Sequence, residues 1–382
     1  EEIIITTPVQ ANITPSIQSS KLLTENKVSK RDGDDEEKDG SNDDDVTPND
    51  SGDSDDFILP GLESGSNTSF GAFAAASITS GTNNTAIGFQ ALLSTTSGDN
   101  NVALGYRALF SNTSGNSNTA SGYSAMFNNS TGSLSAAYGY SALYSNQTGS
   151  KNAAFGAYAL FNNTTGENNA AFGYAASYSN TTGSNNSAFG YNALFNNTTG
   201  SNNSAFGYSA LEANTIGSRN SAFGLQALYS NTTGSFNTAI GSQALYSNTT
   251  GAENVAFGSR ALFSNVNGNY NSAGGYGALF FNTSGNNNTA FGNSALYANS
   301  TGSNNTGYGY QALRSNTIGS NNTATGYLAL YSNTTGNSNT AYGAAALTSN
   351  TSGRGNTASG YVSLYSNTTG NANTAAGFGA LY

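Results

Sequence analysis

The residues with the clearest capacity for chemistry are asparagines in the pattern Asn-x-Ser/Thr, which recurs at a spacing of 17 residues. This tripeptide accepts N-linked glycans in chains that pass through a glycosylating secretory route. A chain rich in Asn, Ser and Thr also produces it by chance. We select seven candidate glycosylation sites: Asn112, Asn163, Asn197, Asn231, Asn248, Asn333 and Asn367. Further copies of the tripeptide begin at Asn83, Asn185, Asn202, Asn287, Asn304 and Asn321.

Tyrosine and phenylalanine recur at the same spacing and indicate an apolar interface. Long exposed apolar stripes usually mark a surface that contacts another molecule. The alternative is that the rings lie along the protein surface and cover neighbouring backbone. We select ten candidate interface residues: Phe110, Tyr144, Phe161, Phe195, Tyr229, Tyr246, Phe263, Tyr297, Tyr331 and Tyr365.

Catalysis has little support in the sequence. The chain contains no cysteine and no histidine, so the commonest metal ligands and the commonest acid–base side chain are missing. The four carboxylates after residue 63 are scattered over the repeats, in coils far apart, and do not converge. No glycine-rich stretch carries the Lys-Ser/Thr of a phosphate loop. We therefore predict no catalytic residues, no cofactor and no metal site, and a protein that is not an enzyme.

The charged residues are divided unevenly along the chain. Residues 1–63 hold 17 acidic and five basic residues, whereas residues 64–382 hold four acidic and six basic residues. The nearly neutral second part offers no basic stripe for nucleic acid, and no apolar run is long enough to span a membrane. Lys30-Arg31 precedes the acidic stretch and resembles a dibasic processing site. The alternative is two charges in a solvated linker.

Four regions follow from these shifts in composition. Residues 1–31 form an N-terminal extension, which we predict to be a donor strand, through the β-forming stretch at residues 3–9, or a propeptide. Residues 32–56 are almost entirely Asp, Glu, Gly, Ser and Asn, and such a segment stays disordered. Residues 57–80 are an N-terminal cap with a degenerate first repeat. Residues 81–382 are the regular repeats.

The repeat unit is 17 residues long and occurs 18 times without insertion or deletion. We number its positions from the glycine of Thr-Thr-Gly, so that Gly81 is position 1. Positions 4 and 15 are Asn, positions 6 and 11 are Ala, position 8 is Gly and position 12 is Leu, with few exceptions. This composition disfavours helix. It predicts an all-β fold, a single-stranded β-solenoid or flattened parallel β-roll of about 18 coils, each adding about 4.8 Å.

Residues two apart share a face of an extended strand, so the parity of the positions predicts which side chains are buried. We expect positions 6, 8 and 12 to point into a narrow interior and positions 5, 7, 9 and 13 to point outward. Two short strands per coil are expected, near positions 4–8 and 11–14. The asparagines at positions 4 and 15 should stack into amide ladders along the coils.

The segment Asn-Thr-Ala-Ile-Gly, at residues 84–88 and 237–241, resembles the head-domain repeats of YadA-like trimeric autotransporter adhesins. The longer phrase from this segment to Asn-Thr-Thr-Gly also resembles repeats of bacterial and phage fibre proteins. The resemblance covers residues 81–382, with a unit longer than the usual head repeat of that family. It implies a left-handed parallel β-roll, trimerisation through one face and binding to host surfaces.

Together these features predict an extracellular or cell-surface protein that forms fibres by associating with itself. The contact would run through the aromatic rows or through coil ends, such as the bare coil at Tyr382, and would give a trimer or a head-to-tail filament. One alternative is an ice-binding solenoid that uses the Thr rows at positions 5, 16 and 17. Another is an adhesin head that binds surface glycans or a receptor through its Tyr rows.

Overall fold

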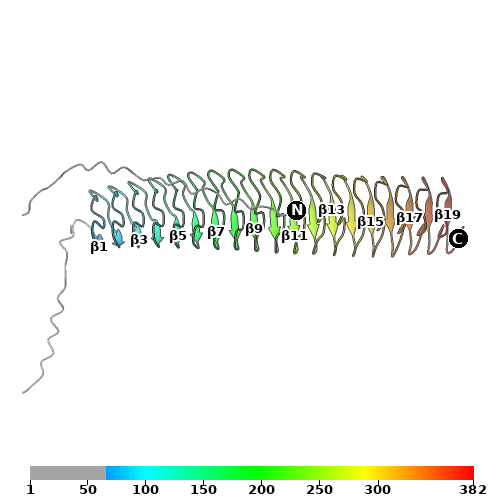
Figure 1. Ribbon diagram of the computed structural model, residues 1–382, viewed down its shortest axis with the longest axis horizontal. Coiled ribbons are helices and arrows are strands. Elements are labelled where there is room, and N and C mark those ends of the chain that lie inside the picture. The colour runs from blue at the N-terminus through cyan, green and yellow to red at the C-terminus, as the bar shows by residue number, and fades with distance from the viewer. Residues whose placement is uncertain (1–65) are drawn as a thin grey trace, which may run out of the picture. The chain divides into compact units, whose positions relative to one another are not determined.

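The structure is a computed structural model that describes residues 66–382. The chain divides into two units, Glu1–Asp56 and Phe57–Tyr382, and the described residues belong to the second unit. The predictions for Lys30-Arg31, for the donor strand at residues 3–9 and for the linker at residues 32–56 therefore lie outside the described residues. Residues 66–382 form a parallel β-solenoid without helices, as the period predicts. Figure 1 shows its turns stacked along one axis.

Each turn of the solenoid contributes one three-residue strand at positions 5–7 of the repeat. The strands are β1 (Thr68–Phe70), β2 (Thr85–Ile87), β3 (Val102–Leu104), β4 (Thr119–Ser121), β5 (Ala136–Tyr138), β6 (Ala153–Phe155), β7 (Ala170–Phe172), β8 (Ser187–Phe189), β9 (Ser204–Phe206), β10 (Ser221–Phe223), β11 (Thr238–Ile240), β12 (Val255–Phe257), β13 (Ser272–Gly274), β14 (Thr289–Phe291), β15 (Thr306–Tyr308), β16 (Thr323–Thr325), β17 (Thr340–Tyr342), β18 (Thr357–Ser359) and β19 (Thr374–Ala376).

The strands pair in parallel with the same register throughout. Ala205 pairs with Ala222, and Ala222 pairs with Ala239, exactly one repeat apart in each case. Because every coil has the same length, residue i lies directly beside residue i + 17. Each repeat position therefore forms one row along the solenoid, and a property of a position becomes a property of a whole surface.

The prediction of a second strand at positions 11–14 is wrong. Positions 10 and 12 adopt left-handed backbone conformations, with φ of 52° at Ser209 and 53° at Leu211, so the chain turns instead of extending. The backbone N–H of Ala210 donates to the Gly207 carbonyl 3.4 Å away within the same coil, while Leu211 donates to Ala227 of the next coil at 3.0 Å. The turns thus keep hydrogen bonds between coils without forming a sheet.

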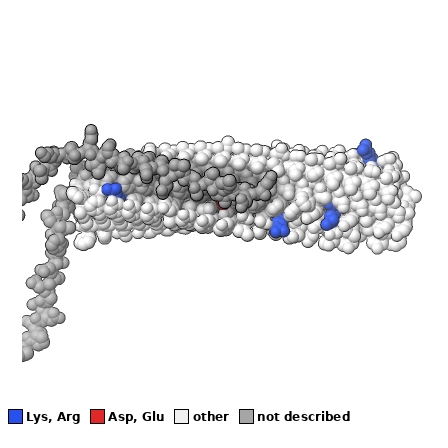
Figure 2. All heavy atoms as spheres, viewed as in Figure 1, with Lys and Arg blue, Asp and Glu red and all other residues white. Residues whose placement is uncertain are grey.

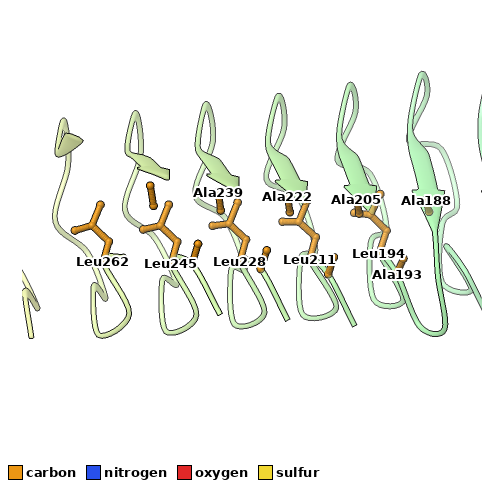
Figure 3. Close-up of a cluster of buried hydrophobic side chains, with 14 of the residues drawn as sticks. Ala188, Ala193, Leu194, Ala205, Leu211, Ala222, Leu228, Ala239, Leu245 and Leu262 are labelled. Carbon is orange, nitrogen blue, oxygen red and sulfur yellow. The ribbon is translucent and has the colours of Figure 1, made fainter. Parts of the chain in front are cut away.

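The interior consists of three rows of apolar side chains. Ala205, Ala210 and Leu211, at positions 6, 11 and 12, are fully buried, and their equivalents from the coil of β2 to the coil of β18 are buried too. Figure 3 shows the leucines directed into the interior beside the alanines of the strands. The prediction for positions 6 and 12 is confirmed. Ala at position 11 is an additional buried residue, because the left-handed residue on each side of it breaks the simple alternation.

The glycine at position 8 does not fill the interior as expected, because it is half-buried at a corner of the coil. Gly207 has a φ of +143°, and a Cβ atom on it would lie 2.4 Å from the carbonyl oxygen of Gly224. A side chain at this position would therefore collide with the next coil. Glycine is required here by the spacing between coils and by the backbone conformation together.

Candidate functional site

The asparagines at position 15 form a buried ladder of amide groups. Asn197 is fully buried, and its Nδ2 donates to Oδ1 of Asn180 at 2.8 Å and to the carbonyl of Gly200 at 2.9 Å. Its Oδ1 accepts a hydrogen bond from Nδ2 of Asn214 at 2.8 Å. The predicted amide ladder at this position is confirmed, and each amide joins the coils on both sides of it.

A second ladder runs along position 4. The backbone N–H of Asn203 donates to Oδ1 of Asn186 at 2.9 Å, and its Nδ2 donates to the carbonyl of Gly217 at 2.8 Å. This side chain is also fully buried. The two ladders satisfy polar groups that would otherwise be costly inside a thin core, since an unpaired buried polar group costs about 1–3 kcal/mol.

The ladder at position 15 contains all seven candidate glycosylation sites. Asn112, Asn163, Asn197, Asn231, Asn248 and Asn333 are fully buried, whereas Asn367 is half-buried. A glycan on Nδ2 of the six buried residues would replace hydrogen bonds that join two coils and would find no space. The tripeptides that begin at position 3, such as those at Asn185 and Asn202, place an exposed asparagine at a corner instead. Glycosylation of the chain itself stays a prediction.

The ten candidate interface residues all belong to position 13, where the rings stack from coil to coil. Adjacent rings are parallel, with centroids 4.8 Å apart for Phe110 and Phe127 and 5.1 Å apart for Tyr144 and Phe161. The six rings of the first stack are Phe110, Phe127, Tyr144, Phe161, Tyr178 and Phe195. The five rings of the second stack are Tyr229, Tyr246, Phe263, Phe280 and Tyr297. The side chains within these stacks are half-buried.

Charged residues interrupt this row at two places. Glu212 separates the two stacks. Its negative charge is the main cause of a raised pKa of the neighbouring Tyr229 phenol, and partial burial adds to the shift. Arg314 follows the second stack, with its guanidinium 5.3 Å from the ring centre of Tyr297 and 5.9 Å from that of Tyr331. The cation therefore continues the stack between two rings.

The rows at positions 9 and 10 complete a face with position 13. The guanidinium of Arg107, at position 10, lies 5.1 Å from the ring centre of Tyr106 and 5.5 Å from that of Phe110. Tyr158, also at position 10, contacts Phe161 of position 13 and Tyr174 of position 9. Burial is the main cause of its raised pKa. We call positions 9, 10 and 13 together the turn face.

The outer surface of the strands forms a second face, made of positions 5 and 7. We call it the sheet face. The middle residue of each strand from β2 to β19 points inward and is buried, while the first and third residues point outward in most of these strands. Rings at position 7 stack as closely as those at position 13, with centroids 4.6 Å apart for Phe189 and Phe206. Selecting only position 13 therefore missed residues of an equally regular aromatic row.

The stacked arrangement limits what the rings can bind. Each inner ring of a stack has a neighbouring ring on both faces, with ring centres 5.2–5.3 Å apart around Tyr191, so mainly its edge is accessible. Tyr191, which stacks between Tyr174 and Tyr208, is still 46% exposed. These rows therefore offer apolar edges and phenol hydroxyls rather than open ring faces.

The threonine hydroxyls at position 16 are used within the solenoid. Oγ1 of Thr181 donates to the carbonyl of Thr198 at 3.0 Å, and Oγ1 of Thr198 donates to that of Thr215 at 3.0 Å. This row therefore binds the coils to one another. The threonines at position 17, such as Thr199, are exposed.

Charged and metal-binding side chains are sparse on this part of the chain. No group of three or more carboxylate, histidine or cysteine side chains comes together within residues 66–382. In Figure 2 isolated Lys and Arg side chains interrupt a surface of uncharged residues. The described residues also include no helix long and apolar enough to cross a membrane. No protein-family model, curated protein or solved structure matches the chain.

Proposed function

We propose that this protein is a rigid structural element of an extracellular or cell-surface fibre and that it associates with itself through its outer aromatic rows. The observation that carries this proposal is the combination of an uninterrupted hydrogen-bonded stack of coils with continuous rows of half-exposed rings outside it. Exposed apolar rows of this length are typical of interfaces. The resemblance of the repeats to adhesin and fibre repeats points in the same direction.

The geometry supports the two alternatives less well. A glycan stacks on an open aromatic face, and the ring faces within the Tyr rows are covered by neighbouring rings. An ice-binding array needs regular free hydroxyls, and many hydroxyls at position 16 already donate to the next coil. Head-to-tail contact through coil ends stays a prediction.

The full chain tests this proposal directly. We expect sedimentation velocity to show association that grows with protein concentration, and negative-stain electron microscopy to show paired or bundled rods. Three surface variants, Tyr174→Ser, Tyr191→Ser and Tyr208→Ser, combined in one chain, measure how much the turn face contributes to association. Serine already occupies this position at Ser242 and Ser259, so the fold accepts it. A chain that stays monomeric at every concentration would contradict the proposal.

A further inference from the structure

We propose that the sheet face is a self-complementary interface on which a second copy of this chain docks. In this dimer the two solenoids run parallel, with a two-fold axis between them along the stacking direction. The inference rests on the proposed function, and it names the surface and the geometry of the association.

Six consecutive strands, β5 to β10, carry a distinctive pair of outward rows. The third residue of each strand is aromatic, and the rings stack with centroids 4.6–4.9 Å apart. We call these rings the ridge: Tyr138, Phe155, Phe172, Phe189, Phe206 and Phe223. The first residue of the same strands is always small. We call these residues the shelf: Ala136, Ala153, Ala170, Ser187, Ser204 and Ser221.

The ridge and the shelf coincide in the same six strands and not elsewhere. On both sides of them the first strand residue is Thr or Val, as at Thr119 in β4 and Thr238 in β11, except in β13, where Ser272 is followed by the third residue Gly274. The third residue there is often small or aliphatic, as at Ser121 and Ile240. A raised aromatic row beside a low row of small side chains, both about 29 Å long, gives this part of the sheet face a step in height.

A two-fold axis along the stacking direction places the step of one copy against the step of the other. Rotation by 180° about such an axis keeps both solenoids parallel and exchanges the two rows across the interface. The ridge of each copy then lies on the shelf of the other, in the same coil. An axis parallel to the strands would instead oppose ridge to ridge and leave the two shelves apart. Interdigitation of this kind is how paired sheets exclude water.

Charge also favours the sheet face as the contact between copies. No strand from β2 to β19 contains a charged residue at its outward positions. The turn face, in contrast, carries Arg107, Glu212, Arg260 and Arg314. Docking that contacts only positions 5 and 7 therefore removes no charge from water. Removing a charge would cost several kcal/mol per ion.

The size of the face indicates how the interface is built. Six strands of three residues cover about 29 Å by about 10 Å, or about 300 Å² on each copy. Stable complexes bury about 800 Å² on each partner. The complete row of strands, about 85 Å long, provides about 850 Å². The ridge and the shelf thus form the packed centre of an interface that needs most of the sheet face.

Cysteine cross-linking of the full chain tests the geometry, because the chain has no cysteine of its own. A mixture of the Ser204→Cys and Phe206→Cys proteins is oxidised mildly. We expect the mixed cross-link between position 204 of one copy and position 206 of the other to exceed the share that random collision gives. Thr199→Cys, exposed at position 17, is the control and should cross-link only at background level. Cross-links of Phe206→Cys mainly with itself would overturn the proposal, as would preferred pairing of Ser204→Cys with Phe223→Cys.

A bulky shelf variant separates this inference from the proposed function. Ser204→Phe should raise the dissociation constant of the dimer about ten-fold or more, because it obstructs the ridge of the partner copy. Thr340→Phe, beside Tyr342 and outside the six strands, should change it less. Hydrogen exchange of the strand amides in each variant checks that the fold is intact. An equal dissociation constant for the Ser204→Phe and Thr340→Phe variants would overturn the sheet-face dimer alone. A parent chain that stays monomeric would overturn the proposed function as well.

Discussion

The buried asparagine ladders and the outer aromatic rows are both produced by the same 17-residue spacing, but they tolerate change very differently. The ladders deviate at Thr95 and Ser135, and each substitute still provides a hydroxyl oxygen that accepts a hydrogen bond. Asn112 Nδ2 donates to Thr95 Oγ1 at 3.4 Å, and the N–H of Asn152 donates to Ser135 Oγ at 3.1 Å. The outer rows accept Glu212, Arg314 and Ser242. Hydrogen bonding inside thus constrains the chain more tightly than stacking outside.

Removing one amide from the ladder should have the largest effect on stability. Asn197→Ala leaves Asn180 Oδ1, the Gly200 carbonyl and Asn214 Nδ2 each without one of their hydrogen bonds. We expect a loss of about 4 kcal/mol in the free energy of unfolding, since each stranded buried group costs about 1–3 kcal/mol. Urea unfolding and hydrogen exchange of the adjacent amides measure this loss.

The control for this prediction is the neighbouring Asn196→Ala, where the side chain is exposed at position 14. It should change stability by less than about 0.5 kcal/mol. Asn197→Thr should recover part of the loss, because Thr95 shows that a hydroxyl can accept the ladder hydrogen bond. Equal losses for Asn196→Ala and Asn197→Ala would show that the ladder does not stabilise the coils.

Adding a side chain at the glycine where two coils approach closely should have the next largest effect on stability. Gly207→Ala introduces a Cβ atom 2.4 Å from the Gly224 carbonyl oxygen at a φ of +143°. We expect a loss of about 3 kcal/mol from the collision and the strained backbone. Gly355→Ala makes the same change at a φ of +65° with no atom within 4 Å, and should cost about 1 kcal/mol. Chemical denaturation of both variants compares the two losses, and the reverse order would contradict the close approach of the coils.

Much of this difference between the interior and the outside follows from the sequence. The near-invariance of Asn at positions 4 and 15 predicts the ladders, and the fixed spacing predicts the solenoid. The alternation rule fails after Gly207, because Ser209 and Leu211 adopt left-handed conformations that residues other than glycine rarely take. The near-invariant Ala at position 11 was the available signal for its burial. The parity of positions 5 and 7 predicts the outward residues of the sheet face. The rows that make up the turn face depend on these same turns and could not be derived from spacing.

Removing one outer ring should have a smaller effect on stability. Tyr191→Ala loses stacking with Tyr174 at 5.2 Å and with Tyr208 at 5.3 Å, but leaves no buried polar group unpaired. We expect a loss of about 1 kcal/mol. Alanine already stands at this position in Ala157 and Ala344. A loss measured by urea unfolding that equals the loss for Asn197→Ala would remove the distinction between the interior ladders and the outer rows.

The smallest expected effect concerns the ionisation of Tyr229 beside Glu212. The carboxylate charge raises the pKa of this phenol above its ordinary value of 10.0, because a second negative charge is unfavourable next to the first. The neutral phenol therefore contributes stability that is fully present below pH 10 and is lost as the pH rises through the higher pKa of the folded state. Glu212→Gln should lower the pKa of Tyr229, which NMR titration of labelled tyrosine measures, and should lessen this alkaline loss of stability. Tyr365, which has no acidic neighbour in its row, is the internal control. If the pKa of Tyr229 stays the same in the Glu212→Gln variant, the charge of Glu212 does not affect the neighbouring ring of this row.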